Sequence, residues 1–180
     1  QWLLLYNEIY QNSIAPRQNA EVALVDNEEI LPNSMQKKAL NNLEDLRNDG
    51  ANKALLISAT GTGKTYLSAF DVASFNPSKC LYVVHRRNIA EAAMKTFKNV
   101  IGQNNSYGLY SGNKREIEAD FLFTTIQTMS RESNLNQFKA DHFDYIIVDE
   151  THRAGAESYL RVIEYFDAQF LLGMTATPER

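Results

Sequence analysis

Short apolar segments alternate with helical patterns over most of this chain, and this alternation restricts the fold more than any other feature of the sequence. The apolar segments are Ala54–Ile57, Leu81–Val84, Phe121–Phe123, Tyr145–Val148 and Phe170–Leu172. They lack alternating polar residues, which is typical of parallel strands buried on both faces of a sheet. The helical patterns lie at Lys64–Ser74, Arg87–Phe97, Ile126–Arg131 and Ala156–Tyr165. This order predicts a doubly wound, mostly parallel α/β domain with three layers, α/β/α.

The chain before the first of these strands divides into two parts. Asn33 or Ser34 can cap a helix with apolar positions up to Leu46, and Gly50 lies where a C-terminal glycine would end it. Closer to the N-terminus, the apolar residues between Trp2 and Tyr10 have the spacing of an amphipathic helix. A short strand is expected at Glu21–Asp26. We expect residues 1–31 to be a linker or the tail of a preceding domain, and residues 32–180 to form the main domain.

Composition excludes several classes of protein. Hydrophobic residues make up 44% of the chain and charged residues 22%, which is typical of a globular domain. The longest apolar runs, such as Trp2–Tyr6, are far shorter than the roughly 20 residues of a membrane-spanning helix, so no membrane partner is expected. Cys80 is the only cysteine, which excludes an internal disulfide and favours a cytoplasmic location. The chain begins at Gln1 rather than a methionine, and we expect it to be a fragment of a longer protein.

The charge distribution contains a basic stretch within an acidic chain. The formal net charge is −4, which argues against a uniformly basic nucleic-acid-binding protein. Between residues 79 and 115, however, Glu91 is the only acidic residue among seven basic ones, which are Lys79, Arg86, Arg87, Lys95, Lys98, Lys114 and Arg115. This stretch is a candidate track for an anionic partner. The alternative is an ordinary solvated surface that is locally basic.

A glycine-rich segment between the first apolar segment and the next helix is typical of a phosphate-binding loop. It reads Ser58-Ala-Thr-Gly-Thr-Gly-Lys-Thr65. The glycines let backbone N–H groups turn toward a phosphate chain, the lysine can reach the β and γ phosphates, and the Thr65 hydroxyl can bind Mg²⁺. Ser58 replaces the usual first glycine of the pattern. The predicted nucleotide-binding residues of this loop are Thr60, Gly61, Thr62, Gly63, Lys64 and Thr65.

Two carboxylates follow the apolar segment that ends at Val148. Hydrolysis of a nucleotide needs one carboxylate to hold Mg²⁺ and a group that orients and deprotonates the attacking water. Asp149 suits the first role and Glu150 the second, with Lys64 as the third catalytic residue. The alternative is a solvated acidic turn at the end of a strand. His152, three residues after Asp149, is a candidate for a hydrogen bond that senses the γ-phosphate.

In combination, these motifs resemble those of superfamily 2 helicases and translocases. Ser58–Thr65, Asp149–His152 and Thr175–Thr177 look like motifs I, II and III of that superfamily. The segment 172–180 closely resembles the motor subunits of type I and type III restriction enzymes and related bacterial DEAD/DEAH-box helicases. The resemblance covers residues 32–180. It implies a first RecA-like motor domain that uses ATP and Mg²⁺.

The resemblance also implies where nucleic acid would bind. Val84–Arg87 looks like motif Ia and Phe123–Met129 like motif Ib, both of which contact the sugar-phosphate backbone in the family. The residues carried over are Arg86, Arg87, Thr124 and Thr125. The two arginines also lie within the basic stretch. The alternative for the threonines is simple capping of the helix that follows.

Two further assignments follow from the resemblance. Gln36 lies where the family has a glutamine that reads adenine, although Asn33 and Met35 stand where many relatives carry an arginine and an aromatic residue. Thr175 and Thr177 are expected to couple hydrolysis to movement of nucleic acid, through hydrogen bonds that reach His152.

The leading functional hypothesis is therefore the ATP-binding half of a helicase or translocase. The family's second RecA-like domain supplies arginine fingers, and it is absent from these 180 residues, so this chain is expected to bind nucleotide and hydrolyse it poorly. Two alternatives remain open: a nucleotide-gated binding module without motor activity, and a P-loop ATPase that does not act on nucleic acid. Restriction-type relatives favour double-stranded DNA as the partner, but the sequence leaves DNA and RNA both possible.

Overall fold

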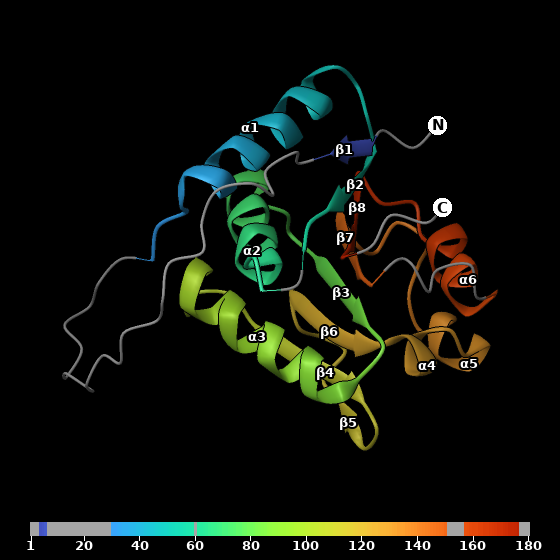
Figure 1. The fold of residues 1–180 in the computed structure, drawn as a ribbon. Coiled ribbons are helices and arrows are strands. Elements are labelled where there is room, and N and C mark those ends of the chain that lie inside the picture. The colour runs from blue at the N-terminus through green and yellow to red at the C-terminus, as the bar shows by residue number, and fades with distance from the viewer. Residues whose placement is uncertain (1–3, 7–29, 60, 151–156, 177–180) are drawn as a thin grey trace, which may run out of the picture.

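A computed structural model describes residues 4–6, 30–59, 61–150 and 157–176 of the chain. These residues form an α/β domain whose helices lie on both sides of one sheet (Figure 1). In chain order the elements are β1 (Leu4–Tyr6), α1 (Ser34–Asn48), β2 (Lys53–Ile57), α2 (Lys64–Phe75), β3 (Cys80–Val84), α3 (Arg87–Ile101), β4 (Tyr107–Ser111), β5 (Lys114–Arg115), β6 (Phe121–Thr125), α4 (Ile126–Met129), α5 (Glu132–Leu135), β7 (Tyr145–Asp149), α6 (Glu157–Tyr165) and β8 (Phe170–Thr175). No helix in these described ranges is long and apolar enough to cross a membrane.

The sheet has the strand order β1-β2-β8-β7-β3-β6-β4-β5, and only the β4–β5 pair is antiparallel. Helices α1, α2 and α3 lie on one side of this sheet, and α4, α5 and α6 lie on the other (Figure 1). All of the parallel strands end at the same edge, which therefore collects the loops that follow β2, β3, β6, β7 and β8. The predicted doubly wound, three-layer fold is confirmed.

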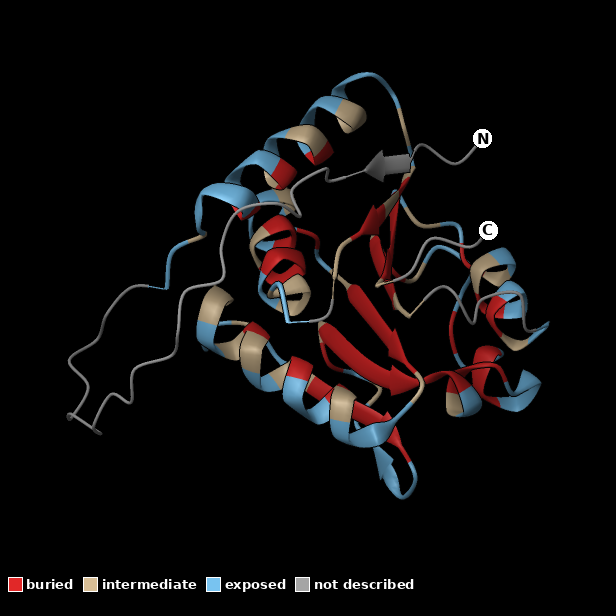
Figure 2. Cartoon of the chain, viewed as in Figure 1, coloured by how far each residue is buried: buried red, intermediate tan, exposed pale blue. Residues whose placement is uncertain are grey.

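Alternate residues of the central strands supply two separate hydrophobic cores. On β3, Tyr82 and Val84 pack with the side that carries α2 and α3, whereas Leu81 and Val83 pack with the opposite side. All five residues of β3 are buried, as are all five of β6, so the central sheet is red in Figure 2. This two-sided burial explains why these strands lack alternating polar residues.

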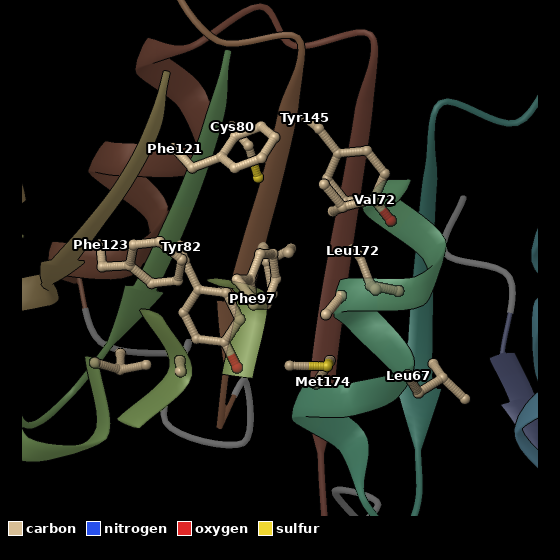
Figure 3. Packing of buried hydrophobic residues seen from close by; sticks show 14 of the residues in the cluster. Leu67, Val72, Cys80, Tyr82, Phe97, Phe121, Phe123, Tyr145, Leu172 and Met174 are labelled. Carbon is tan, nitrogen blue, oxygen red and sulfur yellow. The ribbon is translucent and has the colours of Figure 1, made fainter. Parts of the chain in front are cut away.

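An aromatic cluster fills the core between β3, β6 and α3. The Tyr82 ring stacks on Phe123 at a centroid distance of 5.5 Å and meets Phe97 edge-on at 5.4 Å (Figure 3). Phe97 also meets Phe123 edge-on at 5.2 Å. Such aromatic pairs add about 0.5–1.5 kcal/mol each beyond the burial of their area. The cluster therefore holds the Tyr82 side chain in one orientation within the sheet.

Some element boundaries differ from those predicted. The expected helix over Ile126–Arg131 is two four-residue helices, α4 and α5, because Arg131 has extended backbone angles and caps the second. Strands β4 and β5 were not predicted, since β4 is short and contains Gly108. A Cβ atom at Gly108 would lie 2.3 Å from the carbonyl oxygen of Glu116, so the close approach of the hairpin strands requires glycine there.

The predicted N-terminal amphipathic helix is wrong for the residues that the structure describes. Residues 4–6 form strand β1, which pairs in parallel with β2 at the edge of the sheet. Pairing with the main sheet has overridden the helical spacing of the apolar side chains. The strand predicted at Glu21–Asp26 lies outside the described residues, and the origin of residues 1–31 as a linker or tail remains a prediction.

Candidate nucleotide site

The loop between β2 and α2 has the backbone conformation that a phosphate-binding loop needs. Gly61 and Gly63 have φ values of 80° and 79°, in the left-handed region that favours glycine. Gly63 is the N-cap of α2, so the helix begins at Lys64. A Cβ atom at Gly63 would lie 2.8 Å from the Gln36 Nε2 atom. The loop is therefore closed against helix α1 at a position where only glycine fits.

The Lys64 side chain turns back into this loop. Its ammonium group donates hydrogen bonds to the carbonyl oxygens of Ser58 at 2.9 Å and Ala59 at 3.0 Å. Burial lowers the pKa of Lys64, while the charges of Asp149 and Glu150 act in the opposite direction. The Lys64 ammonium group therefore lies within reach of the charges of both predicted catalytic carboxylates, and its contact with phosphate remains a prediction.

Ser58, which replaces the usual first glycine, has a structural role in the loop. Its hydroxyl is 2.7 Å from the Thr62 hydroxyl, and Thr62 also donates to the Ala59 carbonyl at 2.8 Å. The Ser58 backbone N–H donates to the Thr175 carbonyl oxygen at 3.0 Å. This last bond ties the phosphate loop to the end of β8. Thr60 lies outside the described residues.

The two acidic residues lie at the end of β7. Strand β8 lies between β7 and β2, the strand that leads into the phosphate loop. The Glu150 backbone N–H donates to the Asp149 Oδ1 atom at 2.9 Å, and Glu150 has a left-handed φ of 60°. Burial raises the pKa of Asp149, while the Glu150 N–H and the charge of Lys64 favour its ionised form. A partly buried carboxylate near a lysine is an electrostatic arrangement that is frequent at functional sites.

Tyr82 adds a hydrogen-bond donor next to the Asp149 carboxylate. In the sequence, nothing marks this tyrosine except its place in a buried strand. Its hydroxyl donates to the Asp149 Oδ2 atom at 3.5 Å, which is long for a hydrogen bond. Burial raises the pKa of Tyr82 well above its usual range, and the side chains of Thr65 and Ser68 also interact with the hydroxyl. Tyr82 therefore lies between the two predicted metal ligands, Thr65 and Asp149.

A cavity of about 210 Å³ lies beside the loop and extends to the start of α1. Its lining residues are Asn33, Met35, Gln36, Leu56, Ser58, Gly61, Thr62, Lys64 and Leu67. Lys64 lies near one part of the cavity and the apolar side chain of Met35 lines another. This mixture of a cation, loop backbone and apolar wall fits a nucleotide.

Gln36 is not a plain residue on the surface of α1. It is buried, its Oε1 atom accepts a hydrogen bond from the Asn33 N–H at 3.0 Å, and its Nε2 donates to the Gly63 carbonyl at 3.3 Å. Together with the bond from the Gln36 N–H to the Asn33 side chain at 2.9 Å, this completes a capping box at the start of α1. Gln36 thus joins α1 to the phosphate loop, and adenine reading by it remains a prediction.

The donor set near the loop fits Mg²⁺ better than a transition metal. Thr65 and Asp149 offer a hydroxyl and a carboxylate oxygen, and Mg²⁺ is usually held by one or two carboxylates together with phosphate and water. In the described part of the chain, no group of three or more His, Cys, Asp and Glu residues could hold a metal ion. Cys80, the only cysteine, is buried within β3.

The predicted nucleic-acid residues fall into different environments. Arg86 is exposed at the edge where β3 ends and is the N-cap of α3. Arg87 is partly engaged: its Nε donates to Glu91 at 2.9 Å, and its Nη1 donates to the Asn113 side chain at 3.4 Å. Arg87 therefore fastens α3 to the tip of the β4–β5 hairpin. Arg86 is the better placed of the two for an external anion.

The threonines after β6 point inward. Thr124 is fully buried, and its hydroxyl donates to the Tyr110 carbonyl at 2.7 Å. Because a hydroxyl has one proton to donate, the predicted bond from Thr124 to phosphate does not agree with this arrangement. Thr125 is 7% exposed and its hydroxyl lies 2.9 Å from that of Thr128. Helix α4, which follows Thr125, has only four residues, so its dipole adds little attraction for phosphate.

The basic stretch 79–115 does not form one continuous track. Lys79 precedes β3 and pairs with Asp120 at 3.2 Å, whereas Arg86 follows β3. A strand rises about 3.3 Å per residue, so these two cations are separated by roughly 20 Å along the sheet. Lys98, in the last turn of α3, lies 5.6 Å from the centroid of the Tyr107 ring. Only part of the stretch therefore lies at the edge of the sheet that carries the phosphate loop.

The predicted coupling residues are described only in part. Thr175 is the last residue of β8, is buried, and accepts the hydrogen bond from the Ser58 N–H. His152 and Thr177 lie outside the described residues, so the hydrogen bonds predicted between them and Thr175 remain predictions. The structure adds a direct backbone link between motif III and the phosphate loop.

Comparison with known proteins places these motifs in a family. Residues 29–180 match the family model described as "Type III restriction enzyme, res subunit". The chain is 28% identical over 162 residues to the type I restriction enzyme EcoAI endonuclease subunit of Escherichia coli. That match covers 82% of this chain but only 19% of the relative's length.

Solved structures share the fold at low sequence identity. A nuclease-deletion mutant of the Type ISP restriction-modification enzyme LlaGI, solved in complex with a DNA substrate mimic, superposes with a TM-score of 0.65 at 20% identity. The match covers 84% of this chain and 18% of that one. The Pyrococcus furiosus Hef helicase domain gives a TM-score of 0.68 at 18% identity, over 83% of this chain and 34% of that one. This chain therefore shares its α/β fold with part of each of these two proteins.

Proposed function

The chain belongs to the family of the type III restriction enzyme res subunit, and on that premise we propose that it is the ATP-binding and ATP-hydrolysing half of a nucleic-acid-dependent helicase or double-stranded DNA translocase. The observation that carries the proposal is the convergence of three charged groups at one edge of the sheet. Lys64, Asp149 and Glu150 come from two strand ends and interact electrostatically with one another. ATP hydrolysis needs a phosphate-binding cation, a metal-binding carboxylate and a base, and these three residues provide them.

Each residue has a distinct role in the proposed reaction. Lys64 and the N–H groups of the loop at Gly61 and Gly63 bind the β and γ phosphates of ATP. Thr65 and Asp149 would hold Mg²⁺, and the charge of the ion would neutralise the charge that develops on the phosphate oxygens. Glu150 orients the attacking water and accepts its proton. Met35 and Gln36, at the start of α1, lie where the base of the nucleotide would contact the protein.

Efficient turnover in related ATPases depends on arginine fingers. Arginine fingers contributed in trans or from a second domain raise the rate of related ATPases by about 10³–10⁵. We propose that a second RecA-like domain in the same full-length protein supplies them, and that residues 32–180 act with it as a motor. The 180-residue chain by itself is expected to bind nucleotide and to hydrolyse it slowly.

The proposed partner is DNA. The E. coli relative is a restriction endonuclease subunit, and the LlaGI structure contains a DNA substrate mimic. Within this chain, Arg86 is an exposed cation at the same edge of the sheet as the phosphate loop, with Arg87 beside it. Contacts of this kind bind the phosphate backbone and carry no sequence information.

Two variants test the proposed site. Lys64→Ala should weaken binding of a fluorescent ADP analogue by at least tenfold, because it removes charge-assisted hydrogen bonds worth about 1.5–3 kcal/mol each. Unchanged affinity would remove the phosphate-loop assignment.

Glu150→Gln, in the full-length protein, should retain nucleotide binding and lose about 10²–10⁴ in hydrolysis rate. The test of the motor function is whether double-stranded DNA raises the ATPase rate; no stimulation by DNA or RNA would favour an ATPase that does not act on nucleic acid.

A further inference from the structure

His85 lies between the segment proposed to bind nucleic acid and the proposed catalytic base. It follows the last residue of β3, and Arg86 comes immediately after it. Strands β3 and β7 are parallel neighbours, with Val83 opposite Val148. The same register, continued two residues further, brings His85 opposite Glu150. The pairing of β3 with β7 therefore places His85 and Glu150 next to each other.

The side chains make this contact. The His85 Nδ1 atom lies 3.1 Å from the Glu150 Oε2 atom. The His85 side chain is 14% exposed and that of Glu150 is 36% exposed, so the imidazole is largely enclosed while the carboxylate remains accessible. The distance is that of a hydrogen bond, and an imidazole with its proton on Nδ1 would donate to the carboxylate.

The alignment of this contact is imperfect. The His85 Nδ1 atom is buried and has no well-aligned hydrogen-bond partner among the described residues. Buried polar atoms normally have a hydrogen-bond partner, so the Nδ1 atom of His85, 3.1 Å from a carboxylate but without an aligned partner, needs an explanation. Catalytic hydrogen bonds are often poorly aligned before substrate binds and tighten in the reactive complex. A small rotation of either side chain would complete this one.

The backbone of Glu150 shows that its position is imposed by its surroundings. Its φ of 60° is a left-handed conformation that non-glycine residues rarely adopt, and strain of this kind costs about 1–3 kcal/mol. The Glu150 N–H is fixed on Asp149 at 2.9 Å. The backbone therefore leaves the strand conformation at Glu150, and the Glu150 side chain lies beside His85.

We propose that His85 is a positioning residue that orients the Glu150 carboxylate and thereby links occupancy of the Arg86 segment by nucleic acid to activation of the attacking water. The proposal rests on the function proposed above, in which Glu150 is the base. Orientation of a base by a neighbouring side chain is a recurrent element of catalytic sites, and a misplacement of about 1 Å can reduce a rate by about 10². Because His85 and Arg86 are adjacent in the chain, a phosphate held by Arg86 also fixes the backbone that carries the imidazole.

A pair of substitutions separates positioning from general structural effects. His85→Asn keeps an N–H donor at nearly the position of Nδ1, because both groups are attached at Cγ, whereas His85→Leu fills similar space without a donor. In the full-length protein, His85→Leu should lower the nucleic-acid-stimulated kcat for ATP by about 10- to 100-fold. His85→Asn should recover most of the rate. The KM for ATP and the affinity for nucleic acid should be unchanged in both, because Lys64 and Arg86 are intact.

The Glu150→Gln variant distinguishes failure of this proposal from failure of the proposed function. If Glu150→Gln hydrolyses ATP at the parental rate, Glu150 is not the base and the proposed mechanism is wrong. If Glu150→Gln is inactive while His85→Leu retains the parental kcat, the role of His85 alone is refuted. The double variant should be no slower than Glu150→Gln, since residues that act as a unit have non-additive effects.

A spectroscopic measurement tests the contact without any turnover. The chain contains only three histidines, so ¹⁵N labelling of histidine gives a simple spectrum in which the signals of His85 are those lost in His85→Asn. Glu150→Gln should shift the Nδ1 resonance of His85. Glu91→Gln, which removes an exposed carboxylate on α3, is the matched control and should leave it in place. An unchanged His85 signal in Glu150→Gln would overturn the proposal.

Discussion

Removal of one partner of the Arg47–Asp71 ion pair should strongly destabilise this domain. Arg47 on α1 binds Asp71 on α2 through two parallel hydrogen bonds, Nη1 to Oδ2 and Nη2 to Oδ1, both 2.9 Å long. The Asp71 side chain is only 1% exposed and Arg47 only 15%. The Tyr145 hydroxyl, on β7, donates to the same carboxylate. Figure 3 shows the Tyr145 side chain directed toward α2.

The magnitude follows from how completely the carboxylate is enclosed. Burial disfavours the charge of Arg47, but the hydrogen bonds and charge of Asp71 raise the pKa of Arg47 above its usual value. The guanidinium also lies over the rings of Phe75 and Phe170, at 5.6 and 5.0 Å from their centroids. Arg47→Met would leave the Asp71 carboxylate buried with Tyr145 as its remaining donor. Breaking a buried pair in this way costs about 3–5 kcal/mol.

The assay is a double-mutant cycle followed by urea and thermal unfolding. Arg47→Met should lower the Tm by roughly 6–20 °C, taking about 2–4 °C per kcal/mol for a domain of this size. Arg47→Met combined with Asp71→Leu should be much closer to the parent than the sum of the single effects, because both charges are removed together.

A surface pair of similar length supplies the matched control. Arg161 and Glu157 are 2.8 Å apart on α6, but their side chains are 48% and 87% exposed. Arg161→Met should therefore change stability by less than about 1 kcal/mol. If Arg47→Met is no more destabilising than Arg161→Met, or if the double variant shows simple additivity, the argument from burial is wrong.

Three further predictions address the site and its surroundings. Tyr82→Phe should raise the Mg²⁺ concentration needed for tight binding of a fluorescent nucleotide by about tenfold or more, while binding without Mg²⁺ stays the same; an unchanged Mg²⁺ titration would contradict the role of its hydroxyl. Arg86→Ala should reduce the salt dependence of DNA binding by about one unit of log–log slope, whereas Arg87→Ala should mainly lower the Tm; equal effects on the slope would show that both bind phosphate. Hydrogen bonds from Ser106 lower the pKa of Asp120 in the folded protein. The Asp120 carboxylate therefore stabilises the fold at pH values above about 3.9, the pKa of an unfolded Asp, and this stabilisation is lost as the pH falls through the lower pKa of the folded state. The Tm difference between the parent and Asp120→Asn should accordingly be largest at neutral pH and vanish in acid.

The parts of the molecule that the sequence predicted are those encoded by short, local signals. The glycines at 61 and 63 are needed because of their own backbone angles, and the continuous apolar run before Asp149 is characteristic of a strand buried on both faces. These signals were enough to predict a glycine-rich turn before α2 and an acidic pair after an apolar strand, while the binding of phosphate and Mg²⁺ there remains a prediction. The cap at Asn33 and the position of Gly50 after α1 were likewise visible in a few neighbouring residues.

The parts that could not be predicted depend on partners distant in the chain. The Arg47–Asp71–Tyr145 contact joins three elements, and nothing near any one of these residues indicates the other two. Thr124 has the local sequence of a phosphate-binding threonine, but the position of β4 beside β6 turns its hydroxyl to Tyr110. The basic stretch is continuous in sequence and was predicted as one track, whereas β3 separates Lys79 from Arg86.

Strands β3 and β7 connect the stability of the domain to its proposed chemistry. At the start of these strands, the Lys79 N–H donates to the Asp144 side chain at 2.9 Å, and the Asp144 N–H donates to the Lys79 carbonyl at 2.9 Å. At their other end, the same register brings His85 beside Glu150. A shift of register by one residue would move every side chain of a strand to the opposite face of the sheet and would disperse the site. The bonds that fix the register at one end of the two strands are therefore part of what holds Asp149, the proposed metal ligand, and Glu150, the proposed base, in place at the other end.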